Sequence, residues 1–155
     1  MVSLKNKSKG FTIVELLIVI VVIGILATLV IVTFTGIQQK ARNSQRQSDL
    51  QALQTQLEAF YSQNGYYPAL ADINTTSWRD SNMKNLDKNA MIDPSNSDQT
   101  SATLASEPAA KVYSYEVTDS DDAACSGETC AKYTLTATYE GTVNGATTIV
   151  KTNLD

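Results

Sequence analysis

The pattern of apolar and polar residues divides the chain into an apolar N-terminal stretch and a longer polar remainder. The apolar run begins at Phe11, contains the carboxylate Glu15, and has no charged side chain from Leu16 to Val32. About 20 apolar residues in a helix, at about 1.5 Å each, cross the roughly 30 Å hydrocarbon core of a bilayer. The pattern therefore predicts a membrane helix. Because an ionised side chain costs roughly 2.5–3.5 kcal/mol at a bilayer centre, Glu15 is expected to have a partner.

The helical pattern continues beyond this segment but becomes amphipathic. Apolar residues recur at intervals of three and four from Ile37 to Tyr61, and Asn64-Gly65 followed by Pro68 supplies a stop. The pattern predicts one helix over about residues 12–63, whose second half (36–64) packs one face on a soluble domain. The basic residues of this half are expected to form mainly a solvated face, with lipid headgroups or an acidic neighbour as alternatives. They are Lys40, Arg42 and Arg46.

Residues 65–110 are rich in Gly, Asn, Asp, Ser and Thr and are predicted to form an irregular connection. One short helix is expected between Trp78 and Met91. Aromatic side chains near the start of the connection are expected to anchor it on the core rather than to bind a ligand; they are Tyr66, Tyr67 and Trp78.

After residue 110 the apolar period changes to two, which is typical of strands with one buried face. The predicted inward residues are Tyr113, Tyr115 and Val117 in one strand and Tyr133, Leu135, Ala137 and Tyr139 in the next. Asn144-Gly145 then precedes ATTIVKT, and Asn-Gly between two β-rich runs is a strong hairpin signal. We therefore expect an antiparallel sheet of three to four strands within residues 111–155, packed on helix residues 50–61. The predicted fold class is α+β.

The charges are distributed as unevenly as the apolar residues. Lys5, Lys7 and Lys9 precede the apolar run with no acid among them, so the N-terminus is expected to stay cytoplasmic and the polar part to be exported. The formal net charge of −4 would become −7 without residues 1–10, because three lysines leave with them. An acidic soluble domain argues against nucleic acid as its main partner.

The two cysteines, Cys125 and Cys130, are close in sequence. Such a pair can be a redox motif, half of a metal site or a local disulfide. The spacing is not that of CxxC, and a zinc site lacks its other ligands. If the polar part lies outside the cell, a disulfide that closes a small loop is the favoured interpretation.

The acidic residues Asp119, Asp121 and Asp122, with Glu128 nearby, are weak candidates for calcium ligands. Their spacing is not that of an EF-hand, and a solvated acidic turn is favoured. The chain has no His, and neither a catalytic triad nor a phosphate-binding Gly-rich loop is recognisable. We expect no enzymatic activity and no cofactor other than this possible calcium ion.

The segment GFTIVELLIVIVVIGILATLV resembles the N-terminus of type IV pilins and of the pseudopilins of type II secretion. The resemblance is dense over residues 10–36 and continues more weakly to YSQNGYYP at 61–68. It implies a leader at residues 1–10, which prepilin peptidase removes between Gly10 and Phe11, and N-methylation of Phe11. It also implies that Glu15 is the family's acidic assembly residue and that residues 11–35 form the transmembrane and filament-core half of the helix. A secretory signal peptide fits poorly, because the apolar run is too long and is followed by more helix.

The family's function would be structural. The resemblance implies a pilin fold and a subunit of a type IV pilus, acting in adhesion, motility or DNA uptake, with a major pseudopilin of a type II secretion system as the alternative. Some major pseudopilins hold calcium in a C-terminal loop. The implied partners are further copies of the chain, prepilin peptidase, an inner-membrane assembly platform and minor pilins. The implied locations are the cytoplasmic membrane and then an extracellular pilus or periplasmic pseudopilus. From another class, the chain could be a single-pass anchored binding domain.

Two roles for Glu15 remain. Cleavage would leave an amine on Phe11, and the carboxylate of one subunit could pair with the amine of a neighbour and so select one axial stagger. Alternatively, Glu15 lies near the helix start and simply favours the positive end of the helix dipole.

Overall fold

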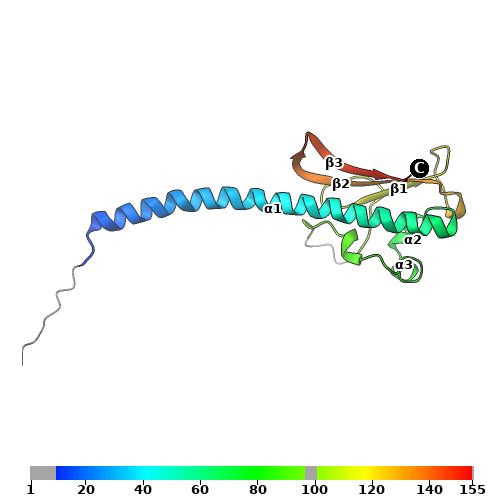
Figure 1. Cartoon of the computed structure of the whole chain (residues 1–155), viewed down its shortest axis with the longest axis horizontal. Helices are drawn as coiled ribbons and strands as arrows, with labels where there is room; N and C mark the ends of the chain where they lie inside the picture. The colour runs from blue at the N-terminus through cyan, green and yellow to red at the C-terminus, as the bar shows by residue number, and fades with distance from the viewer. Residues whose placement is uncertain (1–9, 97–100, 155) are drawn as a thin grey trace, which may run out of the picture. The chain divides into compact units, whose positions relative to one another are not determined.

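The computed structural model describes residues 10–96 and 101–154, so most of the predicted leader lies outside the described residues. The chain has an α+β fold, as predicted (Figure 1). In chain order its elements are α1 (Ile13–Asn64), α2 (Leu70–Asn74), α3 (Thr76–Asn82), the 3-10 helix η1 (Lys88–Met91), β1 (Ser114–Thr118), the 3-10 helix η2 (Gly127–Thr129), β2 (Lys132–Val143) and β3 (Ala146–Thr152).

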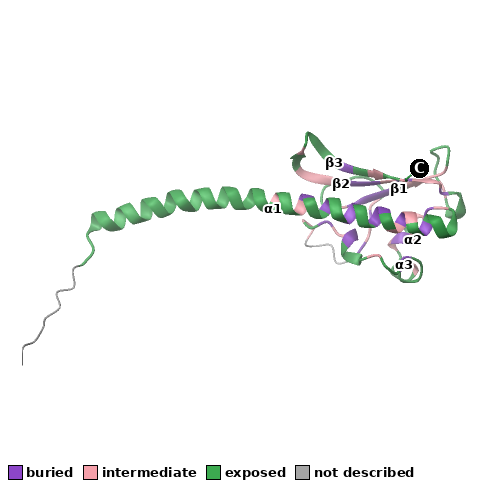
Figure 2. Cartoon of the chain, in the orientation of Figure 1, coloured by how far each residue is buried: buried purple, intermediate pink, exposed green. Residues whose placement is uncertain are grey.

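The chain falls into two compact units that divide after Gln38. In the first unit every described residue is exposed, including the large apolar side chains of α1 (Figure 2). Ile20 is 60% exposed and Leu29 is 62% exposed. Among the described residues, α1 is the helix that is long and apolar enough to cross a membrane. The first unit therefore presents apolar surface that nothing in a single chain covers.

The second unit contains the hydrophobic core, which is formed by the second half of α1, the sheet and residues of the connection between them. Figure 1 shows the sheet on one side of this part of α1 and the short helices α2 and α3 on the other. The prediction that helix residues 50–61 contact the apolar face of the sheet is confirmed, because both faces belong to one buried cluster. From the helix it contains Leu50, Leu53, Leu57 and Phe60, and from the sheet Tyr113, Tyr115, Tyr133, Leu135, Ala137 and Ile149.

The sheet is antiparallel and has the order β1-β2-β3. Tyr115 pairs with Leu135 and Val117 pairs with Tyr133, so the predicted inward residues of β1 and β2 share one face. Ile149 of β3, for which no orientation was predicted, pairs with Ala137. The β2–β3 hairpin turns at Asn144-Gly145, as predicted, with φ of 51° and 84°. Positive φ at both positions is what a type I′ turn requires, and Asn and Gly tolerate it best.

Helix α1 ends where the sequence predicted. Gly65 has φ of 79°, and its N–H donates to the carbonyl of Tyr61 at 2.7 Å. A glycine in the left-handed conformation just past the helix satisfies one of the last carbonyls. The aromatic anchors are also confirmed: Tyr67 is buried, and the rings of Tyr66 and Trp78 lie 5.5 and 5.3 Å from that of Phe60.

The connection differs from the prediction of one short helix between Trp78 and Met91. Helix α3 ends at Asn82, because Met83 leaves the helical region with φ of −128° and ψ of 54°. A separate turn, η1, starts after Asp87, whose carboxylate accepts the Asn89 N–H at 2.9 Å. Local side-chain hydrogen bonds of this kind compete with a continuing helix, so the predicted helix is wrong and two short pieces replace it.

Candidate functional site

The predicted processing residues Gly10 and Phe11 precede helix α1, and both are exposed. Phe11 is 91% exposed, and the helix starts at Ile13. The peptide bond between Gly10 and Phe11 therefore lies in non-helical chain, where a peptidase can reach it. The cleavage itself stays a prediction.

Thr12 and Glu15 form a capping box at the start of α1. The Thr12 N–H and hydroxyl donate to Glu15 Oε2 at 2.8 and 2.7 Å, and the Glu15 N–H donates to Thr12 Oγ1 at 3.2 Å. This reciprocal arrangement satisfies backbone donors that a helix start otherwise leaves unpaired. Thr12 was not among the predicted functional residues, although Thr-x-x-Glu before an apolar run is the sequence signature of this cap.

The capping box bears on the two predicted roles of Glu15, at the helix start and in pairing with a neighbour. Within one chain the carboxylate already has local partners, which supports a role at the helix start. The pairing with a neighbour's amine stays a prediction, since a single chain holds no neighbour. One substitution can remove the charge of Glu15, and a different one can remove its capping hydrogen bonds.

The hydroxyl groups inside the apolar segment are satisfied by the helix itself. Thr28 donates to the carbonyl of Gly24 at 2.9 Å, and Thr33 donates to that of Leu29 at 2.8 Å. Such bonds to the preceding turn leave no side-chain donor that needs water. This part of α1 is therefore suited to lipid or to another apolar surface.

A charged cluster in the second unit joins α1, the residues after η1, and β2. The buried guanidinium of Arg46 binds both oxygens of Asp93 at 2.7 and 2.8 Å and also Glu140 at 2.9 Å. Arg42 forms a two-point contact with the same Glu140 carboxylate. The expectation of a solvated basic face is therefore wrong for Arg46, which is 1% exposed, because carboxylates from distant parts of the chain enclose it.

Glu140 is the centre of this cluster. Its backbone N–H donates to Asn43 Oδ1 at 3.0 Å, and its carbonyl accepts hydrogen bonds from the side chains of Gln39 and Asn43. The hydrogen bond from Arg42 lowers the pKa of the Glu140 carboxyl well below its usual range; partial burial opposes this, and Ser95 and Arg46 lower the pKa further. A cleft of about 450 Å³ lies beside the cluster.

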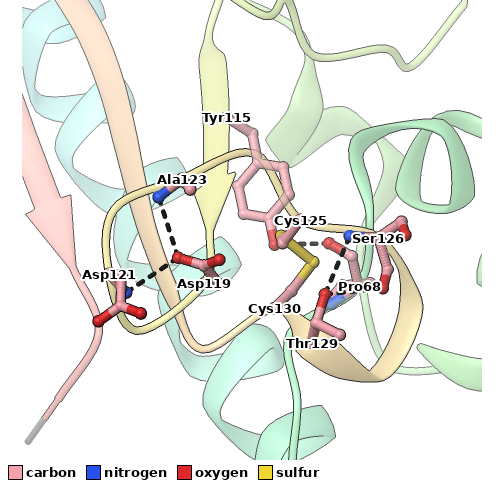
Figure 3. The surroundings of a disulfide bond; sticks show 9 residues. All are labelled: Pro68, Tyr115, Asp119, Asp121, Ala123, Cys125, Ser126, Thr129 and Cys130. Carbon is pink, nitrogen blue, oxygen red and sulfur yellow. Dashed lines mark hydrogen bonds between the residues drawn. A yellow bond between two sulfur atoms is a disulfide. The ribbon is translucent and has the colours of Figure 1, made fainter.

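The cysteine pair and the calcium candidates lie in the loop between β1 and β2 (Figure 3). Cys125 and Cys130 are joined by a disulfide, and the carbonyl of Cys130 accepts the Tyr67 N–H at 2.9 Å. The loop is thereby attached to the chain that follows α1.

The acidic side chains of this loop have partners within the chain. Asp119 Oδ1 accepts the N–H groups of Asp121 and Ala123, both at 2.9 Å (Figure 3). Asp122 pairs with Lys132 at 2.9 Å. Within residues 10–96 and 101–154, no three His, Cys, Asp or Glu side chains are grouped as a metal site. Calcium binding stays an untested expectation.

The comparison with known protein families concerns the same N-terminal segment. Residues 5–31 match the family model of the prokaryotic N-terminal methylation motif. This segment therefore carries a prokaryotic N-terminal methylation motif. This match includes the Gly10–Phe11 junction, the capping box and most of the exposed apolar surface of α1.

Several known proteins are similar to less than half of this chain. Type II secretion system core protein G of Escherichia coli (strain K12) is 40% identical over 63 residues, which cover 41% of this chain and 43% of the relative. The same protein of Dickeya chrysanthemi is 37% identical over 65 residues, 42% of each chain. Type IV major pilin protein PilA of Myxococcus xanthus (strain DK1622) is 36% identical over 66 residues, 43% of this chain and 30% of the relative.

The matched part spans less than half the length of each of these relatives. No solved structure gives a significant match. The fold of the second unit is therefore known from the structure of this chain alone: a helix packed on a three-stranded antiparallel sheet, as in pilin-like proteins.

Proposed function

We propose that this chain is a structural subunit of a type IV pilus, made as a prepilin and assembled into a helical surface filament. The observation that carries the proposal is the fully exposed apolar half of α1, which directly follows the Gly10–Phe11 junction in a segment that matches the methylation motif. Before assembly a bilayer covers this surface. In the filament the same surface packs against equivalent helices of other copies.

The proposed life cycle has defined partners. Prepilin peptidase cleaves after Gly10 on the cytoplasmic side and Phe11 is N-methylated. An inner-membrane assembly platform then moves the subunit from the cytoplasmic membrane into the pilus, with minor pilins in the same structure. The role is structural and not enzymatic, and the filament serves adhesion, motility or DNA uptake.

Glu15 is proposed to set the axial stagger by pairing with the Phe11 amine of a neighbour. A buried ion pair need not add net stability, but one partner left without the other costs roughly 3–5 kcal/mol, which disfavours wrong staggers. The capping box holds the carboxylate at the helix end from which this pair would form.

Two substitutions separate the charge of Glu15 from its cap. Glu15→Gln removes the charge but keeps an oxygen that can complete the box, since Gln also suits this position. Thr12→Val removes the cap hydroxyl and keeps the charge. Filaments sheared from cells should fall more than about tenfold for Glu15→Gln and much less for Thr12→Val. Normal assembly of Glu15→Gln would show that Glu15 acts only at the helix start.

The N-terminus of the mature protein tests the proposal as a whole. Mass spectrometry of protein from sheared filaments should find a chain that starts at Phe11 and carries one additional methyl group. Mature protein that retains Met1 and stays monomeric in detergent would instead indicate a single-pass anchored binding domain.

A second candidate is the major pseudopilin of a type II secretion system. The observation that favours it is the similarity to core protein G of several organisms. Deletion of the chain should then abolish export of secreted enzymes and leave long surface pili intact, whereas loss of the pili with normal secretion supports the pilus subunit.

A further inference from the structure

The second unit carries opposite charges at the two ends of its sheet. At one end, the cleft beside Glu140 is lined by three cations and one carboxylate: Arg42, Arg46, Lys111 and Glu140. At the other end, the loop between β1 and β2 has acidic side chains and no basic residue before Lys132. These acids are Asp119, Asp121, Asp122 and Glu128, and Figure 3 shows part of this loop.

The cleft retains positive charge after its internal pairs are counted. Glu140 is bound by both Arg42 and Arg46, and Arg46 also neutralises Asp93. Lys111 is exposed, and within the described part of the chain no carboxylate pairs with its ammonium group. The Lys111 backbone has φ of 63°, and its carbonyl accepts a hydrogen bond of 3.1 Å from the side-chain amide of Asn96. With respect to the described residues, the Lys111 ammonium group is therefore available to an anionic group of another molecule.

The acidic loop of the same chain is too far away to supply that group. Lys132, which binds Asp122, and Glu140, which lines the cleft, both belong to β2. Eight steps along the strand, at about 3.2 Å each, separate their Cα atoms by roughly 25 Å. Any contact between the loop and the cleft must therefore join two copies.

We propose that the cleft of one subunit receives the acidic loop, residues 119–128, of a second copy of this chain. The inference rests on the proposed filament function and names a contact between the second units of its subunits. Because the two surfaces lie at opposite ends of one unit, the contact is heterologous: each copy offers a free loop and a free cleft. Such a contact generates a ring if its rotation closes and an open helical assembly if it does not, and the second case is what a filament requires. Complementary charge would also suppress wrong pairings.

Zero-length cross-linking of wild-type filaments tests the contact without any mutation. A carbodiimide activates a carboxylate, and the neutral amine of a lysine in contact with it then displaces the urea by-product to form an amide. Mass spectrometry of treated, sheared filaments should identify an amide between Lys111 and Asp121, Asp122 or Glu128. The roughly 25 Å along β2 between the loop end and the cleft end of one unit assigns that link to two copies. If both peptides are detected without modification and no linked product is found, the proposed contact is wrong.

Charge reversal gives a second measurement. Lys111→Glu should lower the yield of sheared filaments about tenfold, and Asp121→Lys in the same chain should restore much of it, because the reversed charges attract again. The matched control is Lys84→Glu, another exposed lysine that lies outside the cleft. If the wild-type chain forms no filaments, the proposed function and the contact are both wrong. If filaments form, and Lys111→Glu assembles like the wild type, the contact alone is wrong.

Discussion

At the scale of single residues, the side chains fall into those whose partners are near in sequence and those whose partners are distant. Thr12 caps α1 together with Glu15, three positions away, and this pattern is visible in four letters of sequence. Arg46 is different, because its partners Asp93 and Glu140 lie 47 and 94 positions away. Nothing in the local pattern distinguishes it from a solvated arginine, so its burial could not be predicted.

The Glu140 cluster is expected to make the folded protein less stable as the pH falls into the acidic range. The pKa of Glu140 is lower in the folded protein than its ordinary value of 4.5, chiefly because Arg42 donates to the carboxylate. The charged form therefore stabilises the fold above about pH 4.5, and this contribution is lost as the pH falls toward the lower folded-state pKa. Glu140→Gln should destabilise the chain most at neutral pH, and its difference from the wild type should shrink between pH 4.5 and pH 3.

Unfolding of the full chain in detergent, followed by the fluorescence of its single tryptophan, measures this effect. Trp78 packs on Phe60 within the second unit, so it reports on the unit that contains the cluster. Glu107→Gln is the control, because Glu107 is exposed. A stability difference between the wild type and Glu140→Gln that stays constant from neutral pH down to pH 3 would contradict the assignment.

At the scale of elements, long periodic segments were predictable and short ones were not. The end of α1 and the inward faces of β1 and β2 follow from apolar periods and stop signals that extend over many residues. Helices α2 and α3 have five and seven residues, too few for a period to be recognised. Contacts such as the Asn74 side chain with the backbone of Leu104 position the chain around them.

The β2–β3 hairpin should be sensitive to a side chain at Gly145. Its φ of 84° lies in the left-handed region, where a Cβ costs about 1–2 kcal/mol. Gly145→Ala should therefore lower the free energy of unfolding by about that amount. Asn144→Gly is the matched control, because glycine accepts the φ of 51° at that position. Equal stabilities of the two variants, from denaturant unfolding, would argue against the type I′ turn.

At the scale of the whole molecule, the two units differ in whether their apolar side chains are buried within one chain. The second unit contains the buried core, the disulfide and the charged cluster. In the first unit no described residue is buried, so it adds apolar surface and no core contact within one chain. The sequence showed that this surface exists, but which subunits or lipids cover it depends on molecules outside the chain.

Removal of residues 1–38 should therefore leave a stable soluble protein. The division after Gln38 keeps Gln39, which donates to the carbonyl of Glu140, and all of the core residues. Residues 39–155 should be monomeric by size-exclusion chromatography without detergent, whereas the full chain should need detergent or lipid. The fragment should unfold cooperatively, with the melting temperature of the second unit in the full chain.

A shorter fragment that starts at residue 47 loses Arg42 and Arg46 and leaves the buried Asp93 without its cation, so it should be strongly destabilised. Aggregation of the 39–155 fragment would show that the first unit supports the fold. Equal stability of the two fragments would show that the charged cluster does not stabilise the second unit.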